Sequence, residues 1–478
     1  MMGKTRSVKP MIFPALVLLA LLMCPAAPAQ TLHLPPHEKL VLKNGLTVLL
    51  MQKRGVPLVN VFAIVKTGAA ADPPGQEGLA AATAALLRKG TKTRTAQQFA
   101  SDFDFIGGTF EADAGSDFTS INAEFMTKDL ARGLELFSDA VLHATFPQEE
   151  TSKILAQALD SVKAEKDEPR AVLRQYFEGY LYGGSPYGRP PDGDEVSLKH
   201  IQRDSIVKFY DANYAPGNTI LGIAGEFDAA ELRKRLEDTF GGWAARSVAA
   251  VAIPATPPAK GKRLLLVDKP DATQTYFAIG NIGTAANDPD RVAIRVVNTV
   301  FGGRFTSELN EALRVESGYT YGANSLFDSR KAPGPFGIFS FTKNQTTVPA
   351  IDLALQVLEK LHKNGVTAEQ LASAKSYIKG QYPPNIETSG QLARRIVYDE
   401  FYGLTDDEVN KLEERVDAVT PETARQVIEK HFPMDNLVFV LIGKASEIRP
   451  AVAKYAGKMD ERSISDPGFW PPPASGVR

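Results

Sequence analysis

Residues 78–91 have the sequence Gly-Leu-Ala-Ala-Ala-Thr-Ala-Ala-Leu-Leu-Arg-Lys-Gly-Thr, and the interpretation of the whole chain starts from them. Alanine has the highest helix propensity, and glycine is the residue that most often follows the last turn of a helix. The stretch therefore predicts a helix closed by Gly90. Taken alone it favours an ordinary packed helix, so any further role has to be argued from the surrounding chain.

The length and composition indicate a large globular protein. The chain has 478 residues, of which 44% are hydrophobic and 23% charged, and this predicts two or more domains with ample material for their cores. The formal net charge of −2 gives no indication of a nucleic-acid partner, and we expect none.

The N-terminus has the pattern of a secretory signal peptide. Basic residues in the first nine positions precede an apolar run at 11–23 that is too short to span a bilayer comfortably. The sequence Ala27-Pro28-Ala29 then matches an A-x-A cleavage site. We expect residues 1–29 to be removed after Ala29, leaving Gln30 as the first mature residue of a periplasmic or secreted protein. No later segment is apolar enough to span a membrane.

The single cysteine, Cys24, lies inside this signal segment. The alternative is a lipoprotein acylated on Cys24, but Met23 differs from the small residues that usually precede such a cysteine. With the signal removed, the mature chain has no cysteine, and therefore no disulfide and no thiol catalysis.

The two halves of the chain resemble one another. The first half has Phe-Ala-Ile-Val at 62–65, and the second has Phe-Ala-Ile-Gly at 277–280. Each half ends with an asparagine, a hydrophobic strand and a glycine, at 218–225 and at 436–443. The offset is the same at both ends of the closing segment, so a duplication explains the similarity better than chance.

The predicted architecture is based on this repeat. Strands mixed with long helices, without strict βαβ alternation, predict an α+β fold of two homologous halves, each a largely antiparallel sheet with helices packed on it. We expect an N-terminal domain at 30–248, a proline-interrupted linker at 249–262, a C-terminal domain at 263–460 and a tail at 461–478, poorly ordered from Asp466 on.

Several segments together resemble the pitrilysin/insulinase-type zinc peptidases, the inverzincins. Residues 182–193 are similar to the family's Tyr-Gly-x-x-Pro-Tyr-Gly-Arg stretch, and residues 210–218 to its Tyr-x-Pro-x-Asn segment. Residues 301–321 resemble its Gly-Gly…Leu-Arg-x-x-x-Gly-x-x-Tyr segment. The resemblance covers nearly all of residues 38–460 and is nearest to the two-domain bacterial members that are similar to processing-peptidase subunits. It implies the half-clamshell fold of these peptidases.

The same resemblance places a degenerate zinc site on the helix at 78–91. Family members carry His-x-x-Glu-His in this frame, with both zinc ligands and the general base on one helical face. Here Ala81 and Ala85 stand at the histidine positions and Ala84 at the glutamate position. Alanine methyl groups neither bind zinc nor transfer protons, so we expect no metal in this chain.

The family's third ligand is also missing. It is a glutamate about 76 residues past the second histidine, which corresponds to Ser161 by counting and to Gln157 or Ala158 by the neighbouring helix. None of the three is a carboxylate. Asp160 and Glu165 lie nearby, but a carboxylate without accompanying histidines is typical of a solvated helix charge.

One pair of chemically useful residues remains. In family members an arginine and a tyrosine seven residues apart reach the zinc site and help to stabilise the tetrahedral intermediate, and here they correspond to Arg314 and Tyr321. The alternative is structural, with Arg314 paired to Glu311 or Glu316 and Tyr321 packed on a sheet. The first half has Asp104 and Glu111 at the matching positions, so only the second half carries the donor pair.

The resemblance thus implies a zinc-less subunit, inactive alone, of a heterodimeric periplasmic metallopeptidase. A homologous partner is expected to hold the zinc, while this chain completes the chamber for peptide substrates and supplies Arg314 and Tyr321 as catalytic groups in trans. The alternative is a purely structural or peptide-binding pseudo-peptidase module. Retention of the Arg–Tyr pair favours the first interpretation.

Overall fold

The computed structural model describes residues 33–254 and 256–469. The chain divides into residues 1–33 and a compact unit of residues 34–478, and the helices and strands of the described residues belong to the second of these. The predicted signal peptide, with Cys24 and Gln30, lies outside the described residues. So does the triple proline at 471–473.

The first half of the compact unit is built on a six-stranded sheet. Its strands lie in the order β1-β2-β6-β3-β5-β4, and only β2 and β6 pair in parallel. They are β1 (Glu38–Val41), β2 (Thr47–Gln52), β3 (Leu58–Val65), β4 (Thr109–Ala114), β5 (Thr119–Met126) and β6 (Thr219–Gly225).

The second half repeats this sheet. The strands lie in the order β12-β7-β11-β8-β10-β9, with β7 pairing in parallel with both β11 and β12. They are β7 (Arg263–Asp268), β8 (Gln274–Ile282), β9 (Ala323–Phe327), β10 (Pro335–Lys343), β11 (Val438–Gly443) and β12 (Lys458–Ser463).

The predicted α+β fold of two related halves is confirmed. The repeated Phe-Ala-Ile sequences fall in β3 and β8, which occupy the same place in the two strand orders, and the closing strands β6 and β11 also correspond. The outermost position differs, because β1 comes from the start of the first half whereas β12 comes from the end of the second.

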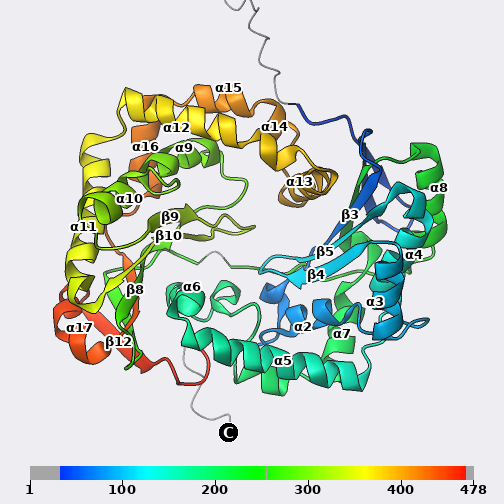
Figure 1. Cartoon of the computed structure of the whole chain (residues 1–478), viewed down its shortest axis with the longest axis horizontal. Helices are drawn as coiled ribbons and strands as arrows, with labels where there is room; N and C mark the ends of the chain where they lie inside the picture. Colours follow the sequence, from blue (N-terminus) through cyan, green and yellow to red (C-terminus); the bar gives the residue numbers. More distant parts are fainter. Residues whose placement is uncertain (1–32, 255, 470–478) are drawn as a thin grey trace, which may run out of the picture. The chain divides into compact units, whose positions relative to one another are not determined.

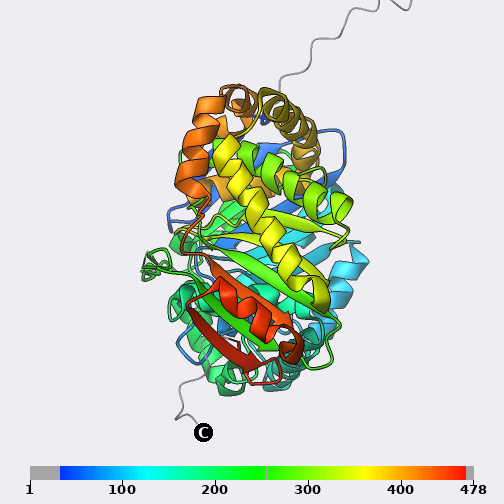
Figure 2. The same ribbon diagram turned by 90° about the vertical axis from the view of Figure 1, so that its left-hand side faces the viewer.

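Helices cover the sheets and frame the space between them (Figure 1). In the first half they are α2 (Leu79–Leu86), α3 (Ala96–Phe105), α4 (Leu130–His143), α5 (Gln148–Asp167), α6 (Pro169–Tyr182), α7 (Arg203–Asn213) and α8 (Ala229–Phe240). In the second they are α9 (Arg291–Phe301), α10 (Glu308–Asn310), α11 (Thr347–Asn364), α12 (Ala368–Gln381), α13 (Ser389–Tyr402), α14 (Asp407–Asn410), α15 (Leu412–Asp417), α16 (Pro421–His431) and α17 (Ala445–Val452). Figure 2 shows α11 crossing in front of the second sheet.

One helix from each half packs on the sheet of the other half. Helix α13 packs on β3 and β6 of the first sheet, whereas α6 packs on β8 and β11 of the second. At Gly222 of β6 an added Cβ would lie 2.4 Å from Cγ2 of Val397 in α13, so only glycine permits this approach. On the other side, the Tyr180 hydroxyl of α6 donates to Asp460 Oδ2 at 2.8 Å. The two halves are therefore interlocked through their cores.

The ends of the second half differ in detail from expectation. The expected linker at 249–262 contains no helix or strand among its described residues, but Val251, Ile253 and Ala259 pack against the core. Strand β12 continues past residue 460 to Ser463, and Phe469 is buried against the Tyr176 ring, so ordered chain extends beyond Asp466. Within the described residues, no helix combines the length and apolar character needed to cross a membrane.

Candidate functional site

Helix α2 forms where the alanine-rich stretch predicts it. It begins after Gly78, whose φ of 94° is left-handed and whose missing Cβ allows Asp192 O to approach. Asp72 accepts hydrogen bonds from the N–H groups of Gly78 and Ala80, both at 2.9 Å, and so anchors the first turn. Burial raises the pKa of Asp72 to about 8, against the opposing effect of these two hydrogen bonds.

The end of α2 is held by a polar network. The helix stops at Leu86, earlier than expected, and a turn leads to Gly90. Thr91 then donates to Asp139 Oδ2 at 2.6 Å, and Arg94 pairs with the same carboxylate at 2.7 Å. The Gly-Leu-Ala…Gly-Thr frame therefore has a structural function that does not require the metal ligands.

The three alanines face the interior. Ala84 is completely buried, whereas Ala81 and Ala85 are half-buried on one side of the helix. Their methyl groups offer no ligand atom and no proton acceptor. The residues at these positions do not fit a zinc ion.

Helix α5, which packs against α2, carries the candidate third position. Gln157 and Ser161 are exposed, whereas Ala158 is half-buried and packs against the core, so Ala158 is the position turned inward. Glu165 is half-buried rather than fully solvated, and burial, with Asp192 nearby, raises its pKa. Asp160 is exposed, as expected for a helix charge.

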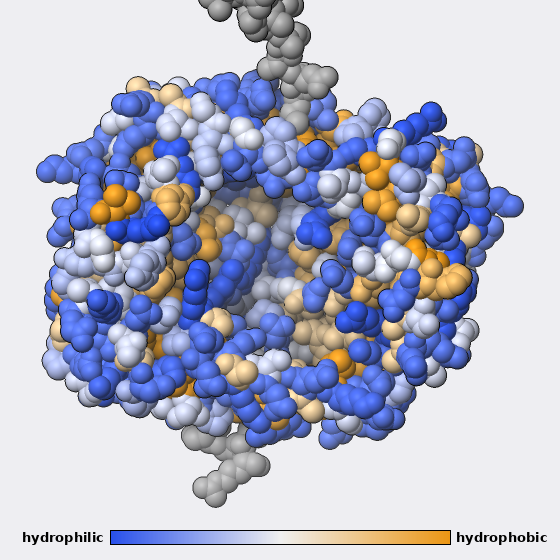
Figure 3. All heavy atoms as spheres, viewed as in Figure 1, coloured by the Kyte–Doolittle hydropathy of each residue, from blue (hydrophilic) through white to orange (hydrophobic). Residues whose placement is uncertain are grey.

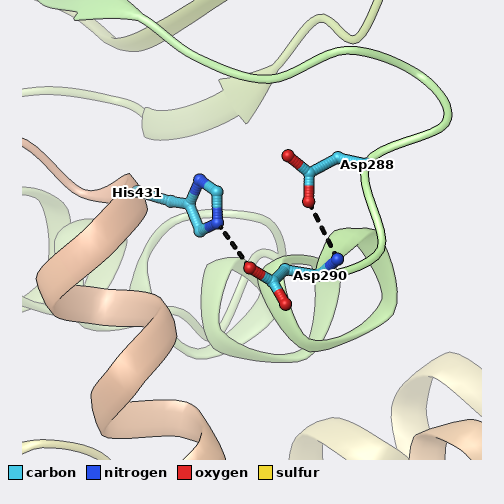
Figure 4. A group of neighbouring side chains, drawn as sticks. All are labelled: Asp288, Asp290 and His431. Atoms are coloured by element: carbon cyan, nitrogen blue, oxygen red, sulfur yellow. Dashed lines mark hydrogen bonds and ion pairs between the residues drawn. The ribbon is translucent and has the colours of Figure 1, made fainter.

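A different trio has the composition of a metal site. Asp288, Asp290 and His431 form the one group of three such side chains found within residues 33–254 and 256–469, with ligand atoms within 4.8 Å of one another (Figure 4). Asp290 Oδ2, however, already accepts from His431 Nε2 at 2.9 Å and from Lys430 at 2.7 Å. This trio therefore fastens α16 to the start of α9, and it is unrelated to the alanines of α2.

Arg314 lies in a π-helix, Glu311–Glu316, that directly follows α10. Such insertions are rare and frequently occur at functional sites. Gly318, whose φ of 65° is left-handed, follows the end of this helix, where glycine is favoured. The Arg314 guanidinium lies over the Phe305 ring at 4.3 Å, and no ion pair joins it to Glu311, Glu316 or any other described carboxylate. The structural pairing considered from the sequence is therefore not formed.

Tyr321 lies just before β9 rather than within it. Its side chain is 82% exposed, so it does not pack on the sheet. The structure thus presents a guanidinium within the π-helix and a phenol on the loop that follows it, both without a carboxylate partner in the described chain. In the first half, Asp104 lies in α3 and Glu111 is exposed on β4, so no equivalent donor pair exists there.

In each sheet, the last strand of the order, β4 or β9, is an edge strand that pairs with a single neighbouring strand. At the edge of the first sheet, β4 pairs only with β5, so alternate N–H and C=O groups of β4 face away from the ladder. At the edge of the second sheet the corresponding groups are occupied, since Ser325 N donates to Gly302 O and Ser325 O accepts from Asn298 Nδ2. The two edges are therefore not equivalent.

Sequence reasoning missed the surroundings of Tyr321. A hollow of about 660 Å³ lies beside it, lined by aromatic side chains and arginines from α6, β8, β10 and the loops around β9. These residues are scattered over more than 200 positions, so no local pattern predicts them. Figure 3 shows this face of the molecule hollowed near its centre, between β9 and β10 on one side and β4 and β5 on the other as Figure 1 places them.

Family models match both halves of the chain. Residues 47–193 match the model described as Insulinase (Peptidase family M16), and residues 200–378 match the model described as Peptidase M16 inactive domain. A Rickettsia bellii protein named as an uncharacterized zinc protease is 28% identical over 340 residues, which cover 71% of this chain and 81% of that protein. A Bacillus subtilis protein with the same description is 24% identical over 354 residues, covering 74% and 85%.

Solved structures show the same fold. A crystal structure of a peptidase M16 inactive domain from Pseudomonas fluorescens has a TM-score of 0.81 and 24% identity, and it covers 85% of this chain and 98% of its own. The crystal structure of a protease from Helicobacter pylori has a TM-score of 0.79 and 21% identity, covering 86% and 100%. At these identities the likeness concerns the fold.

Proposed function

Because this chain belongs to the insulinase-type peptidase family M16, we propose that it is a zinc-less subunit of a heterodimeric metallopeptidase. One observation carries the proposal. The chain combines alanines at the positions of the zinc ligands and base with an 82% exposed Tyr321 and with Arg314, which has no carboxylate partner among the described residues. A scaffold has no need for such a donor pair.

In this proposal the chemistry is divided between two chains. The partner is a homologous subunit with His-x-x-Glu-His, whose zinc activates water for attack on the peptide bond. This chain contributes two hydrogen-bond donors, the Arg314 guanidinium and the Tyr321 hydroxyl, for the oxygen on which negative charge develops. Apart from Phe110 O, which accepts from Arg88 Nη1 at 3.3 Å, the backbone groups of β4 that face away from β5 can pair with an extended peptide.

We also propose that the mature subunit begins at Gln30 and acts in the periplasm, since the basic, apolar and Ala27-Pro28-Ala29 pattern supports secretion. N-terminal sequencing of the secreted chain tests this. A mature chain that begins at an acylated Cys24 would support the lipoprotein alternative instead.

Co-purification tests the main proposal. The tagged chain, expressed in its native host, is expected to bring down a homologue that carries His-x-x-Glu-His. The isolated chain should show no chelator-sensitive cleavage of a fluorogenic peptide, whereas the pair should. A chain that cleaves alone with bound zinc contradicts the proposal. A stable pair whose activity is unaffected by this subunit supports the structural module instead.

A further inference from the structure

We infer that the hollow beside Tyr321 binds an acidic segment of the peptide substrate, with an aromatic or large apolar side chain next to its carboxylates. The inference rests on the proposed function, because that function places the substrate at Tyr321. It adds the substrate class, which neither the fold nor the degenerate zinc site indicates.

The lining of the hollow carries positive charge. Three arginines line it, Arg170, Arg174 and Arg304, and no aspartate or glutamate does. Arg174 is neutralised by Glu178 and Asp328. Arg170 at the start of α6 is exposed, and neither it nor Arg304 has a carboxylate partner among the described residues. The hollow is therefore electropositive.

The charge continues into a neighbouring hollow of about 430 Å³, which shares Gly303 and Tyr377 with the first. Arg291 and Arg295 line it, again without any carboxylate. Arg291 is paired with Glu408, but Arg295 only stacks on the Tyr382 ring and makes no ion pair within the described chain. We call these two adjoining hollows the track; Arg170, Arg295 and Arg304 line it without a carboxylate partner among the described residues.

Two other hollows in the described part of the chain do contain acidic side chains. A hollow of about 410 Å³ at the β4–β5 turn has Asp117, Glu178, Asp192 and Asp328 beside its arginines. Another hollow, of about 500 Å³ beside α10, is lined by Glu308, Glu311 and Glu316. Arg304 lines both this hollow and the track. Lysine-rich peptides would favour those surfaces, whereas the track attracts carboxylates.

The aromatic lining gives the second element of specificity. Tyr276 and Phe341 stack with their centroids 5.4 Å apart in this lining, and Phe339, whose ring contacts Phe177 of α6, lies in the same lining. Phe305, which also lines the hollow, is 67% exposed, and the Arg314 guanidinium lies over its ring. A flat apolar floor with arginines at its rim suits an aromatic side chain flanked by carboxylates.

Direct peptide binding to the purified single chain tests the inference. The probe is a fluorescein-labelled octapeptide with glutamates on both sides of a phenylalanine, and its matched control has lysines in place of the glutamates. Fluorescence anisotropy should show that the glutamate peptide binds at least about tenfold more tightly, the effect of one charge-assisted hydrogen bond. The preference should shrink as salt is added.

Two variants locate the site. Arg170→Gln and Arg304→Gln are each expected to weaken the glutamate peptide about tenfold and to leave the lysine peptide unchanged. Arg54→Gln is the matched control, because Arg54 is an exposed arginine on the β2–β3 connection, outside the track. Circular dichroism confirms that each variant is folded.

Equal binding of the two peptides overturns the inference, and so does an equal loss of binding in Arg54→Gln and the two track variants. The measurement requires neither a partner nor zinc. A selective track in a chain that recruits no zinc-bearing partner would therefore refute the proposed function while leaving the peptide site in place.

Discussion

Replacing Tyr321 by phenylalanine, or Arg314 by lysine, should abolish most of the activity that this subunit confers while changing its stability by no more than about 1 kcal/mol. The Tyr321 side chain is 82% exposed, and no hydrogen bond from its hydroxyl to another described residue is formed. Its removal should therefore leave the free energy of unfolding within about 0.5 kcal/mol of the original. Arg314→Lys keeps the charge and most of the stem and loses only the planar contact with Phe305, worth about 0.5–1 kcal/mol at an exposed site.

The kinetic effect should be far larger. A donor that acts on the developing oxyanion typically contributes ~10²–10³ in turnover, about 3–4 kcal/mol. Cleavage of a fluorogenic peptide by the reconstituted pair should show kcat falling by that factor with a smaller change in KM. Association with the partner should be unchanged in a pull-down.

The control is Arg54→Ala, which removes an exposed arginine distant in sequence from the pair and should change neither quantity. The reasoning is refuted if Arg314→Lys and Tyr321→Phe both assemble and cleave like the original subunit. A loss of stability above about 2 kcal/mol in either variant would show that the residue is structural instead.

Three further predictions concern the scaffold. Ala84→Glu should lower the free energy of unfolding by about 3 kcal/mol in urea titrations because Ala84 is completely buried, whereas the half-buried Ala81→His should cost less than about 1.5 kcal/mol. Gly222→Ala should cost about 1–3 kcal/mol and increase hydrogen exchange in α13, since its Cβ would overlap Val397. Stability should also fall on acidification, because hydrogen bonds from Arg94 hold the pKa of Asp102 below its usual range, and for Asp139 hydrogen bonds from Thr91, Thr93 and Arg94 outweigh burial in lowering the pKa. The stabilisation from these two carboxylates is complete above their unfolded pKa of about 4, and it is lost as the pH falls through their lower pKa values in the folded protein. Arg94→Gln should make stability less sensitive to acid, at a cost of about 3 kcal/mol at neutral pH.

Each of these has a clear contrary outcome. Equal stability of Ala84→Glu and Ala81→His would mean that α2 retains an open cavity. Unchanged exchange in Gly222→Ala would show that α13 is held by other contacts. An acid transition in Arg94→Gln as steep as in the original would assign it to carboxylates outside the network.

The lack of a ligand atom or base on this part of α2 could be predicted from the sequence because it depends only on which side chains are present. No packing can turn the methyl groups of Ala81, Ala84 and Ala85 into ligands or a base. The duplication was predictable for a similar reason, since hydrophobic patterning and turn residues act over short distances along the chain. The strands around Phe62 and Phe277 therefore appear where their sequences place them.

The behaviour of the Arg–Tyr pair could not be decided in this way. The spacing of Arg314 and Tyr321 is equally compatible with a structural pair, and no sequence rule predicts the π-helix at 311–316, whose extra residue depends on how the helix is packed. The exposure of Tyr321, and the lack of an ion pair between Arg314 and any described residue, are consequences of three-dimensional packing.

The sequence by itself determined that this protein has two related α+β halves and that Ala81, Ala84 and Ala85 offer neither a zinc ligand nor a base, because local propensity and side-chain chemistry act at the residue that carries them. The tertiary structure alone decided that α6 and α13 are exchanged between the halves, and that arginines from distant segments meet around one hollow. Burial, charge pairing and cavity shape depend on which surfaces meet, and residues far apart in the chain, such as Arg170 and Arg304, come together only when the fold is complete.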